Sequence, residues 1–333
     1  MKVLFIGGTG IISSACSALA LECGIELYLL NRGKTFKRSI PAGAKLLNGD
    51  IREPDSVKTA LGSLDFEAVV DWVAFTPQHI ETDLDLFRGR TAQYMFISSA
   101  SAYQTPPSTL PVTESTPLDN PFWEYSRNKI ACEERLTQAY RQERFPITIV
   151  RPSHTYDCTL LPFDGGYNII NRMRTGRKVI IPGDGTSLWT LTHHRDFARG
   201  LVGLLGNSHA IGDTFQITSD EILTWNQIYA ILAHAAGVAE PKFVHIASDL
   251  LAAFSPEWGA GLLGDKSNSM LFDNSKIKRV VPDFHCTIPF SRGAEEIMSW
   301  YDADPAHRKV DADIDQLHDQ IIAIYESIYP RAA

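Results

Sequence analysis

The first half of the chain alternates short apolar runs with segments in which apolar residues recur at helical spacing. The runs predict strands over Val3–Ile6, Ile25–Leu30, Ala44–Leu47, Ala68–Val73, Tyr94–Ser98 and Ile147–Val150. The helical spacing predicts helices over Ser13–Glu22, Asp55–Leu61 and Glu124–Arg144. Strands that are apolar on both faces and alternate with helices are typical of a parallel sheet covered on both sides. The pattern therefore predicts an α/β fold with a Rossmann-type doubly wound parallel sheet.

The pattern changes after Arg151-Pro152. Proline, glycine and isolated aromatic residues dominate residues 152–189, and helical spacing returns over Arg195–Leu205 and Trp225–Ala236. We expect a smaller mixed α/β region on the C-terminal side of the sheet. The expected boundaries are 1–155 plus about 192–218 for the sheet domain, and about 156–191 plus 219–333 for the smaller region.

Composition and charge narrow the class of protein. The chain has 333 residues, of which 44% are hydrophobic and 21% charged, and a formal net charge of -8, so a polyanion-binding surface is not expected. No apolar run approaches the ~18 residues that span a bilayer. The five cysteines are scattered without zinc-type spacing, as is typical of reduced thiols. We expect a cytoplasmic protein with no membrane, nucleic-acid or metal partner.

A glycine-rich turn, Gly7-Gly8-Thr9-Gly10-Ile11-Ile12-Ser13, joins the first predicted strand to the first predicted helix. Glycine allows the backbone to approach a phosphate closely, and the N–H groups at a helix N-terminus bind a pyrophosphate. A plain glycine turn is the alternative. The position directly after an N-terminal strand favours a dinucleotide cofactor.

Basic residues follow the second predicted strand. Asn31 and Arg32 end it, and Lys34, Lys37 and Arg38 come next, where NAD enzymes usually carry an acidic residue for the ribose 2′-hydroxyl. A guanidinium can instead bind a 2′-phosphate through two hydrogen bonds. The sequence favours NADP over NAD, and a solvated basic turn that accepts either cofactor is the alternative.

Tyr125 and Lys129 stand four residues apart at the start of the long predicted helix, so their side chains share one helix face. A neighbouring ammonium favours the phenolate form of a tyrosine, which can then take a proton from a substrate hydroxyl as hydride leaves. This spacing is common by chance. Ser99 strengthens the interpretation, because it follows a predicted strand at the end where open α/β sheets bind ligands.

An ordered set of motifs resembles the extended short-chain dehydrogenases/reductases of the NAD-dependent epimerase/dehydratase family. The set comprises the glycine loop, Gly49-Asp50, Ser98-Ser99-x-x-x-Tyr103, Glu114-x-x-Pro117, Tyr125-x-x-x-Lys129 and Arg151-Pro152-x-x-x-Tyr156. The resemblance implies an NAD(P)-dependent oxidoreductase or epimerase that transfers hydride at a hydroxyl or ketone carbon of a sugar or nucleotide sugar. It also implies that the smaller C-terminal region binds the substrate.

The resemblance assigns roles to residues of this chain. It implies a catalytic Ser99, Tyr125 and Lys129, and substrate contacts from Ser99, Ser101, Tyr125 and His154. The residues that it implies for the cofactor are Gly7, Thr9, Gly10, Ile11, Ile12, Asn31, Arg32, Lys34, Asp50, Ile51, Ala74, Phe75, Tyr125, Lys129, Pro152 and His154. By family analogy, the helix Glu124–Arg144 contributes to a homodimer.

Two departures from the family pattern narrow the chemistry. Sugar-nucleotide dehydratases carry an Asp-Glu pair directly after the catalytic serine or threonine, and Ala100 and Ser101 stand there, so a 4,6-dehydratase is not expected. His154 stands where epimerases usually have an asparagine. His154 has either a structural role or a role in the substrate pocket, and the sequence does not identify the substrate.

Two other functions compete with the enzyme. The segments 151–156 and 183–186 are similar to those of chloroplast stem-loop RNA-binding proteins, which share the scaffold but have generally lost the tyrosine–lysine pair. A regulator that senses NADP without turnover is the other alternative. The intact Tyr125–Lys129 pair favours the enzyme over both.

Overall fold

The computed structural model describes residues 1–33 and 38–328. Its centre is a seven-stranded sheet in the order β11-β6-β5-β4-β1-β2-β3, and every strand pairing within it is parallel. This confirms the predicted Rossmann-type sheet. The strands are β1 (Lys2–Ile6), β2 (Glu26–Asn31), β3 (Lys45–Asn48), β4 (Ala68–Asp71), β5 (Tyr94–Ile97), β6 (Ile147–Pro152) and β11 (Asp213–Ile217).

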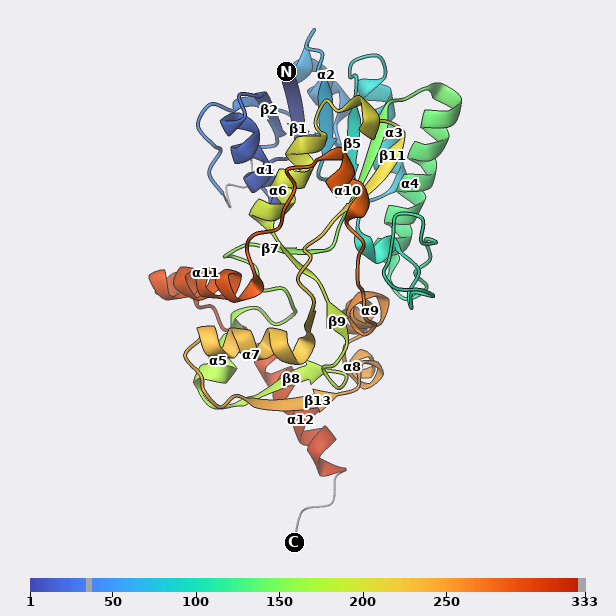
Figure 1. Ribbon diagram of the computed structural model, residues 1–333. Coiled ribbons are helices and arrows are strands. Elements are labelled where there is room, and N and C mark those ends of the chain that lie inside the picture. The colour runs from blue at the N-terminus through green and yellow to red at the C-terminus, as the bar shows by residue number, and fades with distance from the viewer. Residues whose placement is uncertain (34–37, 329–333) are drawn as a thin grey trace.

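Helices cover both faces of this sheet (Figure 1). One face packs against α1 (Ile11–Glu22) and α6 (His194–Leu204), and the other packs against α2 (Pro54–Leu61), α3 (Pro77–Phe87) and α4 (Glu124–Glu143). Two separate hydrophobic clusters result, one on each side of the sheet. Burial on both faces explains why the central strands read as uninterrupted apolar runs.

The strand order places the ligand-binding edge of the sheet. Since all seven strands are parallel, their carboxyl ends share one edge. The chain runs outward from β1 to β2 and β3 on one side, and to β4, β5, β6 and β11 on the other. Ligands of open α/β sheets bind at such a reversal, beyond the carboxyl ends of the strands.

The smaller region lies beyond that edge, at the bottom of Figure 1. It has three two-stranded sheets: β7 (His154–Tyr156) with β10 (Leu191–His193), β8 (Lys178–Pro182) with β13 (Lys242–Ile246), and β9 (Leu188–Trp189) with β12 (Leu223–Thr224). Its helices are α5 (Tyr167–Arg174), α7 (Trp225–Ala235), α8 (Ser248–Phe254), α9 (Pro256–Gly261) and α12 (Ala312–Ser327). Two further helices, α10 (Ser275–Val280) and α11 (Phe290–Ala303), lie in the C-terminal part of the chain.

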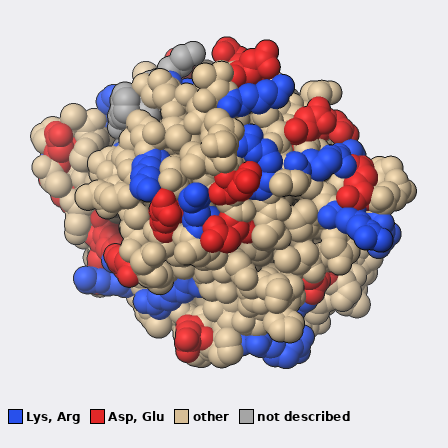
Figure 2. All heavy atoms as spheres, turned by 90° about the horizontal axis from the view of Figure 1, so that it is seen from above, with Lys and Arg blue, Asp and Glu red and all other residues tan. Residues whose placement is uncertain are grey.

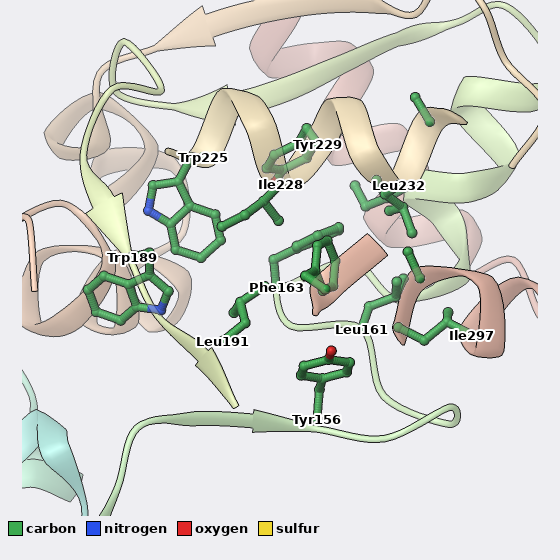
Figure 3. Close-up of a cluster of buried hydrophobic side chains, with 14 of the residues drawn as sticks. Tyr156, Leu161, Phe163, Trp189, Leu191, Trp225, Ile228, Tyr229, Leu232 and Ile297 are labelled. Atoms are coloured by element: carbon green, nitrogen blue, oxygen red, sulfur yellow. The ribbon is translucent and has the colours of Figure 1, made fainter. Parts of the chain in front are cut away.

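Aromatic side chains form the core of the smaller region (Figure 3). Trp189 of β9 stacks on Trp225 of α7 with ring centroids 5.7 Å apart, and Phe163 stacks on Tyr229 at 4.6 Å. Large aromatic rings bury much apolar surface per residue. They therefore allow a region with little regular sheet to be well packed.

Two elements of the sheet domain were not predicted from the sequence. The edge strand β11 carries polar Gln216 within it, and this side chain is buried because it donates to the Val112 and Asp273 carbonyls and accepts from Tyr103. Helix α3 has Ile80, Leu84 and Phe87 at helical spacing, interrupted by a buried acid. Within the described residues, no helix is both long and apolar enough to cross a membrane.

Candidate active site

A cavity of about 1130 Å³ opens at the carboxyl ends of the strands. The structure brings most of the predicted site residues to its walls: Gly7, Thr9, Gly10, Ile11, Ile12, Asn31, Arg32, Asp50, Ile51, Phe75, Ser99, Ser101, Tyr125, Lys129, Pro152 and His154. Ala74 lies beneath the wall with 1% of its surface exposed. Lys34 falls outside the described residues, so its predicted role has no structural counterpart here.

The glycine loop makes the turn from β1 into α1. Gly7 and Gly8 have φ values of +101° and +98°, a region that L side chains rarely adopt. A Cβ atom at Gly8 would lie 2.6 Å from Leu29 Cδ2. The Ser17 hydroxyl holds the turn by donating to the Gly8 carbonyl at 2.8 Å. Both the backbone conformation and the close packing therefore require glycine at position 8.

The N-terminus of α1 faces the cavity. Residues 9–13 line it, and the Ser13 hydroxyl accepts from the Gly10 N–H at 2.7 Å. Ser13 takes the third glycine position of the family loop and is buried. The first N–H groups of a helix have no partner within the helix and favour an anion. The loop and helix terminus thus fit the pyrophosphate of a dinucleotide.

The carboxyl end of β2 forms the next part of the wall. With its amide assigned so that both atoms find partners, Asn31 donates to the Gly7 carbonyl at 2.7 Å and the Leu30 carbonyl at 3.1 Å. Arg32 has a side chain 56% exposed, with its guanidinium 3.9 Å from the Asp50 carboxylate. Arg32 and Asp50 therefore stand together on the cavity wall, beyond the carboxyl ends of β2 and β3.

Arg38 is engaged elsewhere. Its guanidinium donates to Asp157 Oδ2 at 2.6 and 3.0 Å and to the Thr159 hydroxyl at 2.5 Å. Asp157 is buried, so this contact joins the segment after β2 to the segment after β7. Arg38 lines the cavity with its guanidinium bound to Asp157, whereas the Arg32 side chain is largely exposed at the cavity wall.

Lys129 is a buried ammonium group. Its Nζ donates to the Ala74 and Ile97 carbonyls, at 2.7 Å each, and lies 4.7 Å from the ring centroids of Phe75 and Phe96. Burial lowers the Lys129 pKa to about 8, although the Asp71 carboxylate opposes this shift. The positive charge is therefore held at a fixed position beneath the cavity, close to the Tyr125 ring (5.8 Å from Nζ to its centroid).

Tyr125 lies one helical turn earlier, against aromatic neighbours. Its ring centroid is 5.0 Å from that of Trp123 and 6.4 Å from that of Phe75. Burial raises the Tyr125 pKa to about 12, and a hydrogen bond with Ser99 acts in the opposite direction. The sequence had pointed to Lys129 as the group that lowers this pKa. In the structure Ser99 has that effect, because the Lys129 ammonium is directed at two backbone carbonyls.

A chain of hydroxyl groups fixes Ser99. Its Oγ lies 2.9 Å from the Ser101 hydroxyl, which also accepts from the Ser126 hydroxyl at 2.8 Å. The Asn120 amide donates to the Ser101 carbonyl at 2.8 Å. The Ser101 hydroxyl therefore holds the Ser99 side chain in position and connects the serine turn to α4.

Sequence reasoning missed two charged residues on the wall. Asp265 and Lys266 end a short π-helical turn, Leu262–Lys266, and both line the cavity with Tyr125 and His154. Burial raises the Asp265 pKa to about 6. The same cause, reinforced by the Lys266 charge, lowers the His154 pKa to about 3, so this imidazole is neutral at pH 7. No sequence motif marks the π turn, because its residues approach the site through tertiary packing.

Curated relatives cover parts of the chain. The chloroplast stem-loop binding protein of 41 kDa b from Arabidopsis thaliana is 28% identical over 262 residues, which are 73% of this chain and 65% of that protein. UDP-glucose 4-epimerase from Streptomyces lividans is 29% identical over 154 residues, 41% of this chain and 46% of that enzyme. The chain thus spans less than two thirds of either relative's length.

Solved structures share the fold over almost the whole chain. UDP-glucose 4-epimerase from Bifidobacterium longum, in complex with NAD+ and UDP, superposes with a TM-score of 0.71 at 17% identity, covering 92% of this chain and 100% of that one. dTDP-glucose 4,6-dehydratase from Bacillus anthracis, in complex with NAD, gives a TM-score of 0.72 at 17% identity, with coverages of 92% and 98%.

A family model matches most of the sheet domain directly. It describes the NAD dependent epimerase/dehydratase family and matches residues 3–218, from β1 through the end of β11. The match includes the glycine loop and the helix that carries Tyr125 and Lys129. The chain therefore belongs to the NAD dependent epimerase/dehydratase family.

Proposed function

We propose that this protein is an NAD(P)-dependent oxidoreductase or epimerase that transfers hydride at a hydroxyl or ketone carbon of a sugar or nucleotide sugar. The observation that carries the proposal is the convergence of Ser99, Tyr125 and Lys129 on the cavity whose other end is the glycine loop. Family membership and the epimerase relatives support a nucleotide-sugar substrate.

Each residue of the site has a separate role in the proposed hydride transfer. The glycine loop and the N-terminus of α1 would hold a nicotinamide cofactor, which would supply the hydride acceptor and donor. Oxidation requires Tyr125 as the phenolate, with its own proton released to solvent beforehand. The phenolate then accepts the proton of the substrate hydroxyl, and the phenol so formed donates it to the substrate oxygen during reduction. Ser99 hydrogen-bonds the same oxygen. The hydrogen bond with Ser99 acts to lower the Tyr125 pKa, and the Lys129 ammonium places a positive charge 5.8 Å from the centroid of the Tyr125 ring.

We further propose a preference for NADP. Arg32 is half exposed at the ribose end of the cavity, where its guanidinium can bind a 2′-phosphate. Asp50, 3.9 Å away, suits a ribose hydroxyl better than a phosphate, so NAD is the alternative.

Dehydration is not part of the proposed repertoire. Ala100 is apolar and Ser101 uses its hydroxyl to support Ser99, so neither supplies the carboxyl acid and base that water elimination requires. Oxidation, reduction and epimerisation need no such carboxyl pair: Tyr125, Ser99 and Lys129 handle the proton, and a nicotinamide cofactor would supply the hydride.

The test is the turnover of a panel of UDP- and dTDP-sugars with NAD+ or NADP+, followed by NMR, in the wild type and in Tyr125→Phe. Loss of the hydroxyl should lower kcat by about 10²- to 10⁴-fold. Tyr140→Phe, on the same helix but 39% exposed, is the matched control and should keep full activity. Full turnover by Tyr125→Phe would contradict the proposed role.

A second candidate is RNA binding, favoured by the 28% identity with the stem-loop binding protein. The charge distribution does not favour it. The net charge is -8, and Figure 2 shows Lys and Arg interspersed with Asp and Glu on the face seen from above. Fluorescence anisotropy with a stem-loop RNA at physiological salt separates the candidates. Binding tighter than the ~10⁻⁶ M of non-specific contacts would favour RNA.

A further inference from the structure

Two carboxyl groups lie buried beneath Lys129 and belong to no predicted site. Asp71 ends β4 and Asp83 lies on α3, and both residues are 0% exposed. Each carboxyl has one buried oxygen without a donor among the described residues, and the charge of Asp71 acts directly on Asp83. Two buried carboxyl groups so close together cannot both be ionised, so we infer that the pair shares a proton.

The surrounding hydrogen bonds show where the proton lies. Asp71 Oδ1 accepts from the Val73 N–H at 2.5 Å and the Ala74 N–H at 2.9 Å, and Asp83 Oδ2 accepts from the Tyr94 hydroxyl at 2.5 Å. The other two oxygens, Asp71 Oδ2 and Asp83 Oδ1, are buried without a donor among the described residues. One proton between them satisfies both.

Asp83 is the partner that carries this proton. Burial, followed by the charge of Asp71, raises the pKa of Asp83 well above its ordinary value. Asp71 Oδ1 accepts from two backbone N–H groups, whereas Asp83 accepts from the Tyr94 hydroxyl. The Asp71 carboxylate is also the main group that opposes the loss of charge on Lys129.

The same contacts connect Asp71 to the catalytic lysine. Asp71 Oδ1 holds the Ala74 N–H, and the Ala74 carbonyl accepts from Lys129 Nζ at 2.7 Å. We propose that Asp71 is a positioning residue: ionised, it fixes the Val73–Ala74 turn and keeps Lys129 charged, while a protonated Asp83 holds Asp71 in place. The consequence for catalysis rests on the proposed function, whereas the assignment of the proton does not.

Other ionisable groups face the pair from each neighbouring element. Burial keeps the Tyr94 hydroxyl, the Cys132 thiol and the His79 imidazole neutral at pH 7, by raising the pKa values of the first two and lowering the third. Glu133, which also acts on Lys129, is bound by Arg151. Arg52 is the remaining cation, and it donates to the Val73 carbonyl. Of these groups, the Asp71 carboxylate therefore does most to oppose the lowering of the Lys129 pKa.

Two isosteric substitutions test the assignment, because they make the same chemical change with opposite expected results. Asp83→Asn replaces a neutral acid by a neutral amide that can donate to Asp71 Oδ2 and accept from Tyr94. Asp71→Asn removes the charge. The first readout is the Lys129 titration, followed by ¹³C NMR of lysine labelled at Cε and assigned with Lys129→Met. The midpoint should fall by about one to three pH units in Asp71→Asn and stay unchanged in Asp83→Asn.

The second readout is urea unfolding between about pH 5 and 8. A buried acid with a raised pKa binds more protons in the folded state, so its contribution to stability is lost as the pH rises. Asp83→Asn should therefore gain stability over the wild type as the pH increases. An equal fall of the Lys129 midpoint in both variants, or a pH-independent loss in Asp83→Asn, would overturn the proposal.

The remaining outcomes are also decisive. If Asp71→Asn does not fold, the pH-dependent gain of Asp83→Asn alone supports the assignment, and its absence overturns it. Neither readout needs a substrate. A wild-type protein without turnover would therefore contradict the proposed function and leave the proton assignment to be judged by its own measurements.

Discussion

At the scale of the residue, burial shifts the pKa values of the side chains that form the site. Lys129 keeps its proton near neutral pH because Asp71 offsets part of the cost of desolvation, and its pKa is still lowered to about 8. Tyr125 is shifted in the opposite sense, to about 12, so it is a neutral phenol before substrate binds. Both shifts follow from the same low-dielectric surroundings, which disfavour the ionised form of either group.

The lowered pKa predicts how the stability of Lys129→Met depends on pH. The folded state releases the lysine proton near pH 8 and the unfolded state near 10.5, so in the wild type the cost of the buried charge is full below pH 8 and disappears toward pH 10.5. Lys129→Met should gain up to about 3 kcal/mol relative to wild type at neutral pH, and less as the pH rises. Urea unfolding at several pH values measures this. Lys58→Met, at an exposed position, is the control, and an equal pH dependence in both variants would refute the shift.

The cofactor preference is also a question of one residue. Arg32→Ala should weaken NADP(H) about ten- to hundredfold through the loss of charge-assisted hydrogen bonds, and leave NAD(H) nearly unchanged. Isothermal titration with both cofactors measures the difference. Arg292→Ala, an exposed arginine of α11, controls for the loss of positive charge. An equal loss for NAD(H) and NADP(H) would rule out a 2′-phosphate contact.

Individual residues also show which parts of the site could be predicted from the sequence and which could not. Tyr125, Lys129 and Ser99 could be found because spacing on one helix and position after one strand are local properties. Asp71 and Asp83 gave no such signal, since a carboxylate at the end of a strand and another inside a helix become a pair only through packing. Arg38 was noted only as one of the basic residues after the second strand, and its partner Asp157, 119 residues away in sequence, could not be predicted.

At the scale of the element, the glycine loop fixes the tight turn from β1 into α1 at one end of the cavity. Its positive φ values and the close approach of Leu29 leave no room for a side chain at Gly8. The central strands could be predicted because both of their faces are buried. Strand β11 could not, because its buried Gln216 is satisfied by residues distant in sequence, including Tyr103 and Val112 more than a hundred positions away.

Gly8→Ala should therefore lose both stability and cofactor binding. We expect a destabilisation of about 2–4 kcal/mol from backbone strain and overpacking. Gly24→Ala is a matched control, since Gly24 also has a positive φ (+75°) but has nothing within 4 Å of an added Cβ. It should cost about 1 kcal/mol and leave cofactor binding intact. Equal effects of the two changes, by urea unfolding and titration, would show that close packing at Gly8 is unimportant.

At the scale of the whole molecule, the sheet domain and the smaller region enclose one long cavity. The sheet supplies the glycine loop and the Ser99–Tyr125–Lys129 group, and the smaller region supplies His154, Asp265 and Lys266. The sequence predicted the first set and His154. It did not predict Asp265 and Lys266, because short segments of the smaller region take positions that depend on packing in the aromatic core (Figure 3). The homodimer inferred by analogy stays a prediction.

A ligand that binds this cavity should stabilise the whole fold. A cofactor at a hundred times its Kd adds about 2.7 kcal/mol to the free energy of unfolding. Differential scanning fluorimetry with NAD(H) and NADP(H) should thus show an increase in Tm for at least one pair, and a smaller increase for Gly8→Ala. No increase with any of the four would argue against a nicotinamide site.

The most direct test of the central claim is the absorbance of reduced nicotinamide after mixing the oxidised cofactor complex with candidate sugar substrates. The wild type should show the reduced form, transiently if the hydride returns to the sugar and lastingly if a ketone is released. Tyr125→Phe should bind the cofactor equally well and form it at least ~10²-fold more slowly. Equal rates in the two proteins, or conversion of a sugar while the cofactor stays oxidised throughout, would contradict hydride transfer at Tyr125.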